Sequence, residues 1–105
     1  GSVSVLTTQI IAIVATAAQA VVAIGSGKYE FDPPELSFKV GREVTFTLTA
    51  ETEFHTFTVD DLDIDVDLNP GETRIFTFTF DKAGVYKLIC LPHEALGMVG
   101  EIVVR

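Results

Sequence analysis

The sequence predicts an all-β protein: an antiparallel Greek-key β-sandwich of seven or eight strands with an apolar extension at its amino terminus. Three observations predict this fold. Short segments alternate apolar and polar residues, turn residues separate these segments, and no 3.6-residue helical periodicity occurs after Lys28. The 105 residues suit one domain, and 48% hydrophobic residues supply enough material for a packed core.

The amino-terminal stretch differs from the rest of the chain. We expect an extension over residues 1–19, within which Gly1-Ser2 resembles a cloning scar, and a sandwich domain over residues 20–105. Residues 3–24 carry no charge, and residues 6–24 reach the lower end of the length, about 20 residues, that a membrane-spanning helix needs. This stretch predicts a membrane anchor, an added element packed on the sandwich, or an oligomer contact.

The first expected strands follow in order. Residues 28–32 lead into Pro33-Pro34, which cannot lie inside a central strand and marks a bend or an edge. Residues 36–40 alternate apolar and polar side chains and end at a glycine. Residues 44–49 alternate apolar residues with threonine, which predicts one buried and one solvated face, and residues 55–59 repeat this pattern.

The later strands are separated by clear turn signals. Residues 61–68 alternate Asp with apolar residues in strict period two, and Asn69-Pro70-Gly71 then predicts a turn. Residues 76–80 alternate Phe with Thr, and an Ala-Gly turn leads into residues 85–90. The last expected strand covers residues 102–104.

The acidic residues of segment 61–68 allow two interpretations. Together with Glu72 their spacing resembles a calcium-binding loop, but Val66 stands where that loop requires glycine. The strict alternation favours a solvated face of a strand. A charged edge strand of this kind resists pairing with other chains, and it could also dock a basic redox partner.

The formal charge of −8 excludes one class of function. Nucleic acid phosphates would be repelled by such a chain, so we expect no nucleic-acid partner. The charge is consistent with a basic protein partner or with solubility alone.

Four side chains are the candidate metal ligands. Cys90, His93 and Met98 are the only cysteine, one of two histidines and the only methionine, and they occur within nine residues; His55 lies 35 residues before Cys90. Two imidazoles and a thiolate with a weak axial thioether form the set that electron-transfer copper prefers. The soft sulfur ligands hold Cu(I), while the imidazoles also satisfy Cu(II).

Two other chemistries fit these residues less well. A Cys–His nucleophile pair needs an orienting group and an oxyanion hole, and the sequence shows no such signature. A zinc site prefers four ligands without a thioether, so Met98 argues against zinc. We therefore do not expect an enzyme.

The loop CLPHEALGM, residues 90–98, resembles the copper loop of plastocyanins and pseudoazurins, which has the form C-x-P-H-x-x-x-G-M. The similarity extends over roughly residues 20–105, about four-fifths of the chain, and includes FDPPELSFKVG, GVYKLIC and EIVV. This resemblance to cupredoxins implies one copper per chain, cycling between Cu(I) and Cu(II). Its implied ligands are His55, Cys90, His93 and Met98.

The resemblance also implies a place where electrons enter and leave. In such proteins the histidine of the loop reaches the surface through an apolar patch. Here that electron port is expected at His93, surrounded by Pro92, Ala95 and Leu96, with Phe54 beside them.

Two departures from the family pattern stand out. Thr56 follows the upstream histidine where these families often have an Asn that braces the cysteine loop, so bracing is either looser or performed by the threonine hydroxyl. EFHTFTV and LDIDVDLNPGE look more like the copper domain of cytochrome oxidase subunit II. That domain holds two coppers on two cysteines, and the single Cys90 excludes such a binuclear centre.

The expected function is a mononuclear type 1 copper protein that carries single electrons between redox partners, such as basic cytochromes or a membrane oxidase. Two alternatives remain: a copper trafficking or storage protein, and a docking module of a membrane redox complex. The family implies a location outside the cytoplasm, in the periplasm or on the outer face of the cell membrane. Membrane association through residues 3–24 is a further expectation.

Overall fold

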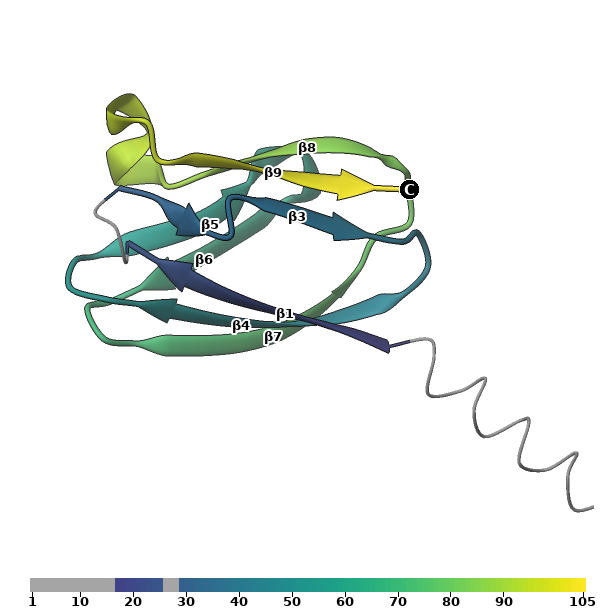
Figure 1. Ribbon diagram of the computed structural model, residues 1–105, viewed down its shortest axis with the longest axis horizontal. Coiled ribbons are helices and arrows are strands. Elements are labelled where there is room, and N and C mark those ends of the chain that lie inside the picture. The colour runs from purple at the N-terminus through teal and green to yellow at the C-terminus, as the bar shows by residue number, and fades with distance from the viewer. Residues whose placement is uncertain (1–16, 26–28) are drawn as a thin grey trace, which may run out of the picture.

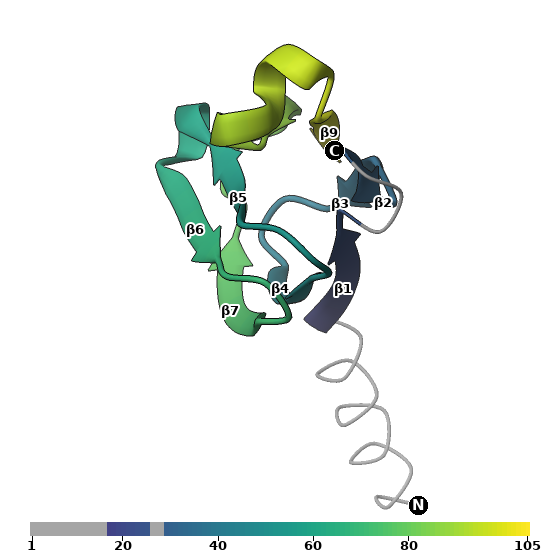
Figure 2. The ribbon, with the colours of Figure 1, turned by 90° about the vertical axis from the view of Figure 1, so that its left-hand side faces the viewer.

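A computed structural model describes residues 17–25 and 29–105 of the chain, and over these ranges nine strands form two packed sheets (Figures 1 and 2). The first sheet has the order β2 (Phe31–Asp32), β1 (Ala17–Ile24), β4 (Glu43–Ala50), β7 (Thr73–Thr79). The second sheet has the order β3 (Glu35–Phe38), β9 (Val99–Val104), β8 (Gly84–Ile89), β5 (His55–Val59), β6 (Ile64–Leu68).

The predicted β-sandwich is confirmed, with two differences in detail. The described residues contain nine strands because β1 adds one to the eight segments that the alternation predicts. Not every pair is antiparallel, since β1 runs parallel to β4 and β3 runs parallel to β9. Alternation indicates which face a side chain occupies but not the direction of the neighbouring strand, and a chain that crosses between sheets can place parallel strands side by side.

Strand β1 shows what the described part of the apolar stretch does. It pairs with β4 from Ala17 opposite Glu43 to Ile24 opposite Ala50, and Val22 and Ile24 are fully buried. Residues 17–24 are therefore an added element of the sandwich, and the expected domain boundary at residue 20 falls within a strand. The rest of the stretch, residues 1–16, lies outside the described residues. In the part of the chain that the structure describes, no helix has the length and apolar character of a membrane span.

Phenylalanines fill the space between the sheets. Phe46 lies at the centre of this group, with its ring centroid 4.9 Å from that of Phe76, 5.5 Å from Phe38 and 5.7 Å from Phe57. Phe46 itself is fully buried. Because these rings come from four strands of both sheets, one aromatic cluster joins the two layers of the sandwich.

The predicted strand over residues 61–68 is shorter than expected. Asp60–Leu62 forms the 3₁₀ turn η1, and Asp63 adopts a left-handed backbone with φ 55°, so β6 begins at Ile64. Asp tolerates this conformation better than most residues because its short side chain can bond locally. The expected solvated acidic face is confirmed, since Asp63, Asp65 and Asp67 are exposed, and β6 is an edge strand.

The ends of several strands meet at one end of the sandwich, away from the carboxyl terminus (Figure 1). There β5 begins, β8 ends and β9 begins, and the 3₁₀ helix η2 (Leu91–Leu96) connects β8 to β9. Three strand ends and one short loop thereby place residues that are distant in sequence close together.

Replacing Phe46 with Ala should destabilise the fold by about 3–5 kcal/mol, because the change opens a cavity where four strands meet. Urea unfolding monitored by circular dichroism measures this loss. Phe54→Ala is the matched control, since Phe54 is 42% exposed and loses little packing. Equal losses in the two variants would contradict a core organised around Phe46.

Candidate metal centre

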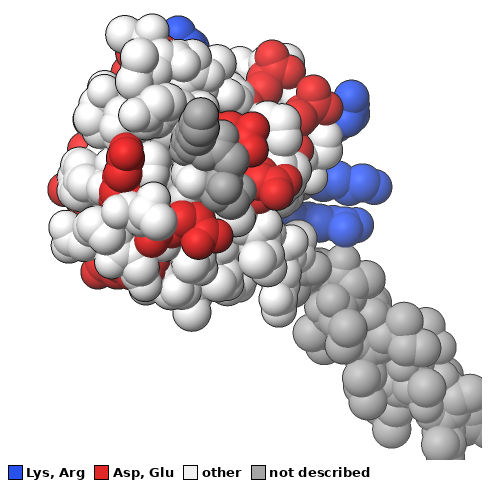
Figure 3. Space-filling model, turned by 60° about the vertical axis from the view of Figure 1, so that its left-hand side comes forward, with Lys and Arg blue, Asp and Glu red and all other residues white. Residues whose placement is uncertain are grey.

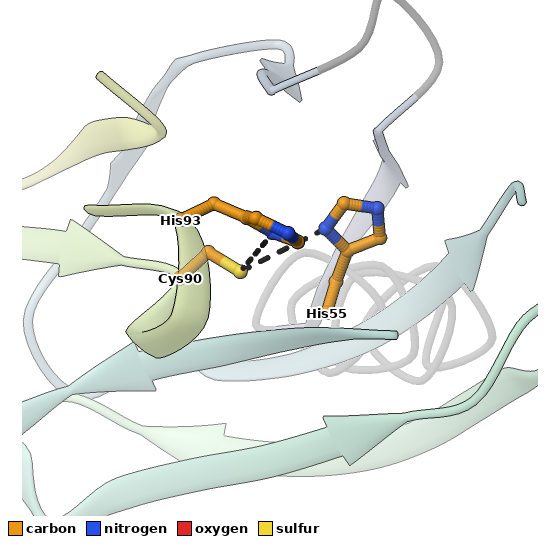
Figure 4. A group of neighbouring side chains, drawn as sticks. All are labelled: His55, Cys90 and His93. Atoms are coloured by element: carbon orange, nitrogen blue, oxygen red, sulfur yellow. Dashed lines mark hydrogen bonds between the residues drawn. The ribbon is translucent and has the colours of Figure 1, made fainter. Parts of the chain in front are cut away.

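The four predicted ligands lie at this end of the sandwich. His55 is the first residue of β5, Cys90 directly follows β8, His93 lies in η2 and Met98 directly precedes β9. The side chains of His55, Cys90 and His93 point toward one another (Figure 4). Cys90 and Met98 are fully buried, and His55 is only 1% exposed.

The donor atoms of three ligands converge. The sulfur of Cys90 lies 3.7 Å from Nδ1 of His55 and 3.4 Å from Nδ1 of His93. Bonds of about 2.0 Å to nitrogen and 2.3 Å to sulfur, the lengths that zinc adopts, separate two such donors by roughly 3.7 Å at a trigonal angle. The three donor atoms therefore fit around a single first-row transition metal ion.

Met98 is held beside these ligands by its backbone. Its N–H donates to the carbonyl of His93 at 3.2 Å, and its carbonyl accepts from the N–H of Cys90 at 3.2 Å. Gly97 makes this return possible, because it adopts a left-handed φ of 89° that glycine tolerates best. The loop thus closes on itself and brings the methionine back to the cysteine.

Thr56 braces the cysteine loop through its hydroxyl, which is one of the two possibilities that the sequence left open. Its hydroxyl oxygen accepts a hydrogen bond of 2.8 Å from the N–H of Leu91. Its own backbone N–H points at the sulfur of Cys90, 3.3 Å away. These two bonds join the cysteine end of the loop to β5.

Gly25 is a site residue that sequence reasoning missed. It follows β1 with φ +79°, and a Cβ at this position would collide with the imidazole of His55. Gly25 therefore lies against His55 at a distance that only glycine permits. The sequence signals a turn here through its glycines, but nothing local indicates that His55 lies against it.

The two imidazoles have different surroundings. Burial lowers the pKa of His55 below its usual value of 6.5, the nearby His93 lowers it further, and Glu53 partly opposes both effects. His55 therefore stays neutral, as a metal ligand must be, to lower pH than a free histidine.

His93 lies at the surface, where the electron port was expected. Its side chain is 15% exposed, its Nε2 lies 3.4 Å from the carboxylate of Glu53, and its ring packs on Tyr29 with centroids 4.7 Å apart. Neither contact could be found from the sequence, because both join segments that are distant along the chain.

The residues expected around His93 are exposed. Pro92 and Ala95 lie at the surface, Leu96 is 58% exposed and Phe54 is 42% exposed. Leu91, which the sequence reading omitted, is 51% exposed and belongs to the same loop. We call Phe54, Leu91, Pro92, Ala95 and Leu96 the apolar rim.

The acidic residues of segment 61–68 do not form a metal cluster. Among the described residues, the only group of three or more His, Cys, Asp or Glu side chains close enough to hold an ion is His55, Cys90 and His93. The calcium interpretation therefore receives no support within that part of the chain.

Comparisons with known proteins find copper proteins and oxidase subunits. The chain is 33% identical over 100 residues to cytochrome c oxidase subunit 2 from Thermus thermophilus, covering 84% of this chain and 74% of the relative. It is 32% identical over 107 residues to chloroplastic plastocyanin from Tetradesmus obliquus, covering 90% and 72%. Halocyanin from Natronomonas pharaonis is 33% identical over 92 residues, covering 83% of this chain and 56% of the relative.

Solved structures agree in fold. Reduced auracyanin from Roseiflexus castenholzii superposes with a TM-score of 0.68 at 20% identity, covering 86% of this chain and 97% of that one. The metal-binding domain of the Cu(I)-exporting ATPase CopA from Streptococcus pneumoniae gives 0.70 at 14% identity, covering 86% and 87%. At these identities the superpositions show a common architecture.

The donor set therefore matches a blue-copper site, with one copper as the cofactor of the chain. The Cupredoxin-like domain family matches residues 3–104, which include all four predicted ligands. Together with a relative more than 30% identical over most of the chain, this match shows that the protein belongs to the cupredoxin-like family.

Proposed function

We propose that the protein is a mononuclear type 1 copper protein that carries single electrons, with His55, Cys90, His93 and Met98 as the ligands. The observation that carries this proposal is the convergence of one sulfur and two imidazole nitrogens at 3.4 and 3.7 Å, with Met98 buried beside them. Copper bound by these residues supplies a one-electron couple between Cu(I) and Cu(II).

Contacts within the protein fix the ligand set in place. His55 is fixed by the β5 ladder and by Gly25, and Cys90 is fixed by the end of β8 and by Thr56. A preorganised site rearranges little when its charge changes by one unit, which favours rapid electron transfer. Burial of His55 and Cys90 also keeps water and substrates from the sulfur, so we infer a carrier rather than an enzyme.

Electrons are proposed to pass through His93, the one partly exposed imidazole of the site. The apolar rim around it offers a surface that a partner can cover while excluding water. Acidic side chains predominate on the face shown in Figure 3. Together with the formal charge of −8, they favour a basic redox protein, such as a cytochrome, or a membrane oxidase as partner.

The proposed location is outside the cytoplasm. The relatives with the names cytochrome c oxidase subunit 2 and plastocyanin support a role beside membrane-bound electron transport. Because residues 17–24 are used in the first sheet, membrane association would depend on residues 3–16. Copper trafficking and docking within a larger oxidase are the alternatives, and the voltammetry described below separates the first of them from a carrier.

One equivalent of Cu(II) should produce an intense thiolate-to-copper absorption band in the visible range, and Cys90→Ser should abolish it. The band requires the sulfur, whereas the serine variant keeps the fold and both imidazoles. Circular dichroism of both proteins provides the control for folding.

A folded protein with a free thiol and no such band would rule out the blue-copper site. If the band is present, cyclic voltammetry and a competing chelator separate a carrier from a trafficking protein. A carrier gives a reversible couple and retains its copper, whereas a trafficking protein loses Cu(I) to the chelator.

Gly25→Ala should weaken copper binding at least tenfold, about 1.4 kcal/mol, because the new methyl group displaces His55. Gly41→Ala is the matched control: Gly41 has a similar φ of +83°, but open space surrounds its Cβ position. Both variants lose stability through backbone strain, and only Gly25→Ala should lose affinity in a competition titration. Equal affinities would show that Gly25 does not position His55.

Leu96→Glu should slow electron transfer to a soluble c-type cytochrome by about tenfold, because a charge in the apolar rim leaves the interface imperfectly desolvated. Stopped-flow absorption measures the rate. Val85→Glu is the control, since Val85 is similarly exposed, 63% against 58%, but lies at the far end of β8. A rate reduced as much by Val85→Glu would place the port elsewhere.

A further inference from the structure

Two buried hydroxyls lie between the copper loop and the acidic edge strand β6. Thr56 and Thr58 are each only 2% exposed, and their spacing of two residues in β5 puts them on the same face of the sheet. Their hydroxyl oxygens are 2.9 Å apart. Hydroxyl groups removed from water are costly unless their hydrogen bonds are satisfied, so the partners of this pair matter.

The hydrogen bonds of the pair run in a single direction. The hydroxyl of Thr58 donates to a carboxylate oxygen of Asp65 at 3.0 Å. A hydroxyl has one proton, so Thr58 must accept from Thr56, and the oxygen of Thr56 in turn accepts from the N–H of Leu91. A chain of donors thus leads from Leu91 through Thr56 and Thr58 to Asp65.

The strand register places Asp65 at the end of this chain. Asp65 lies opposite Thr58 in the β5–β6 ladder, and Asp67 lies opposite Thr56. Both carboxylates therefore belong to the same face of the same edge strand. The side chain of Asp65 accepts from Thr58, whereas Asp67 accepts from Arg74 through its backbone carbonyl.

We propose that Asp65 is a positioning residue for the cysteine ligand and acts through Thr58 and Thr56. The carboxylate can only accept, so the hydroxyl proton of Thr58 points toward Asp65 and the hydroxyl proton of Thr56 points toward Thr58. The oxygen of Thr56 is then free to accept from the N–H of Leu91. Hydrogen bonds aligned in one direction polarise and strengthen one another. Asp65 thereby fixes the peptide that follows Cys90 from a site that touches no ligand.

The same threonine also contacts the ligand itself. The backbone N–H of Thr56 donates to the sulfur of Cys90, and the hydroxyl of Thr56 accepts from Leu91. One residue of β5 therefore makes two hydrogen bonds to this part of the loop. Fixing the side chain of Thr56 therefore fixes the distance between the sulfur and the strand that carries His55. The consequence for electron transfer rests on the copper function proposed above, but the structural device does not require the metal.

Amide hydrogen exchange of Leu91, measured by NMR in the metal-free protein, tests the chain of bonds directly. Thr58→Val and Asp65→Asn should each speed the exchange of this amide by about fivefold or more, as expected for a weakened hydrogen bond. Asp67→Asn removes the same charge from the same face of β6 and should leave the exchange unchanged.

Unchanged exchange in Thr58→Val and Asp65→Asn, or an equal increase in Asp67→Asn, would overturn the proposal. If Thr58→Val does not fold, the two aspartate variants decide the question, because both positions are exposed.

The copper-loaded protein supplies a second readout. Asp65→Asn and Asp67→Asn both remove a negative charge and should raise the fraction of Cu(I) at a fixed ambient potential. We expect Asp65→Asn to raise it further than Asp67→Asn, and Thr58→Val to change it without any change of charge. Identical shifts in the two aspartate variants would mean that Asp65 acts only as a charge. If the wild-type protein gives no blue band, the proposed function fails, while the exchange experiment still decides the role of Asp65.

Discussion

Strands β5 and β8 share the ladder pair Thr58–Ile89, and beyond it Thr56 holds their ends together. It does so with two hydrogen bonds, one to the sulfur of Cys90 and one from the N–H of Leu91. The site depends on this junction, because His55 begins one of these strands and Cys90 follows the other. A single threonine thus braces the cysteine loop, and its one hydroxyl has to serve as donor and acceptor at once.

The site is asymmetric between the interior and the surface of the protein. His55 and Cys90 are buried, Gly25 lies against the imidazole of His55, and burial lowers the pKa of His55. His93 lies instead at the rim of the molecule, between Tyr29 and Glu53. His55 is therefore enclosed by the protein, while His93 is the partly exposed imidazole through which electrons are proposed to pass. A carrier needs both properties, since its centre must stay rigid and dry but remain within reach of a partner.

Strand β1 links the apolar amino-terminal stretch to this site. Its pairing with β4 extends the first sheet, and Gly25, which directly follows it, lies against His55. The residues that looked least like part of a copper domain in the sequence therefore help to build the centre. At the opposite edge of the sandwich, β6 has acidic side chains that remain solvated, and one of them also completes the hydrogen bonds of buried threonines.

The sequence by itself determined the β-sandwich, because period-two alternation and turn residues are local patterns that indicate strands. It also determined the ligand set, because the spacing of Cys90, His93 and Met98 is a local pattern too. Only the tertiary structure decided the parallel pairing of β1 with β4, the cover that Gly25 places over His55, and the contacts of Glu53 and Asp65. Each of these depends on which strands become neighbours and in which register. Alternation assigns a side chain to a face of a sheet, but it carries no information about the strand that will lie beside it.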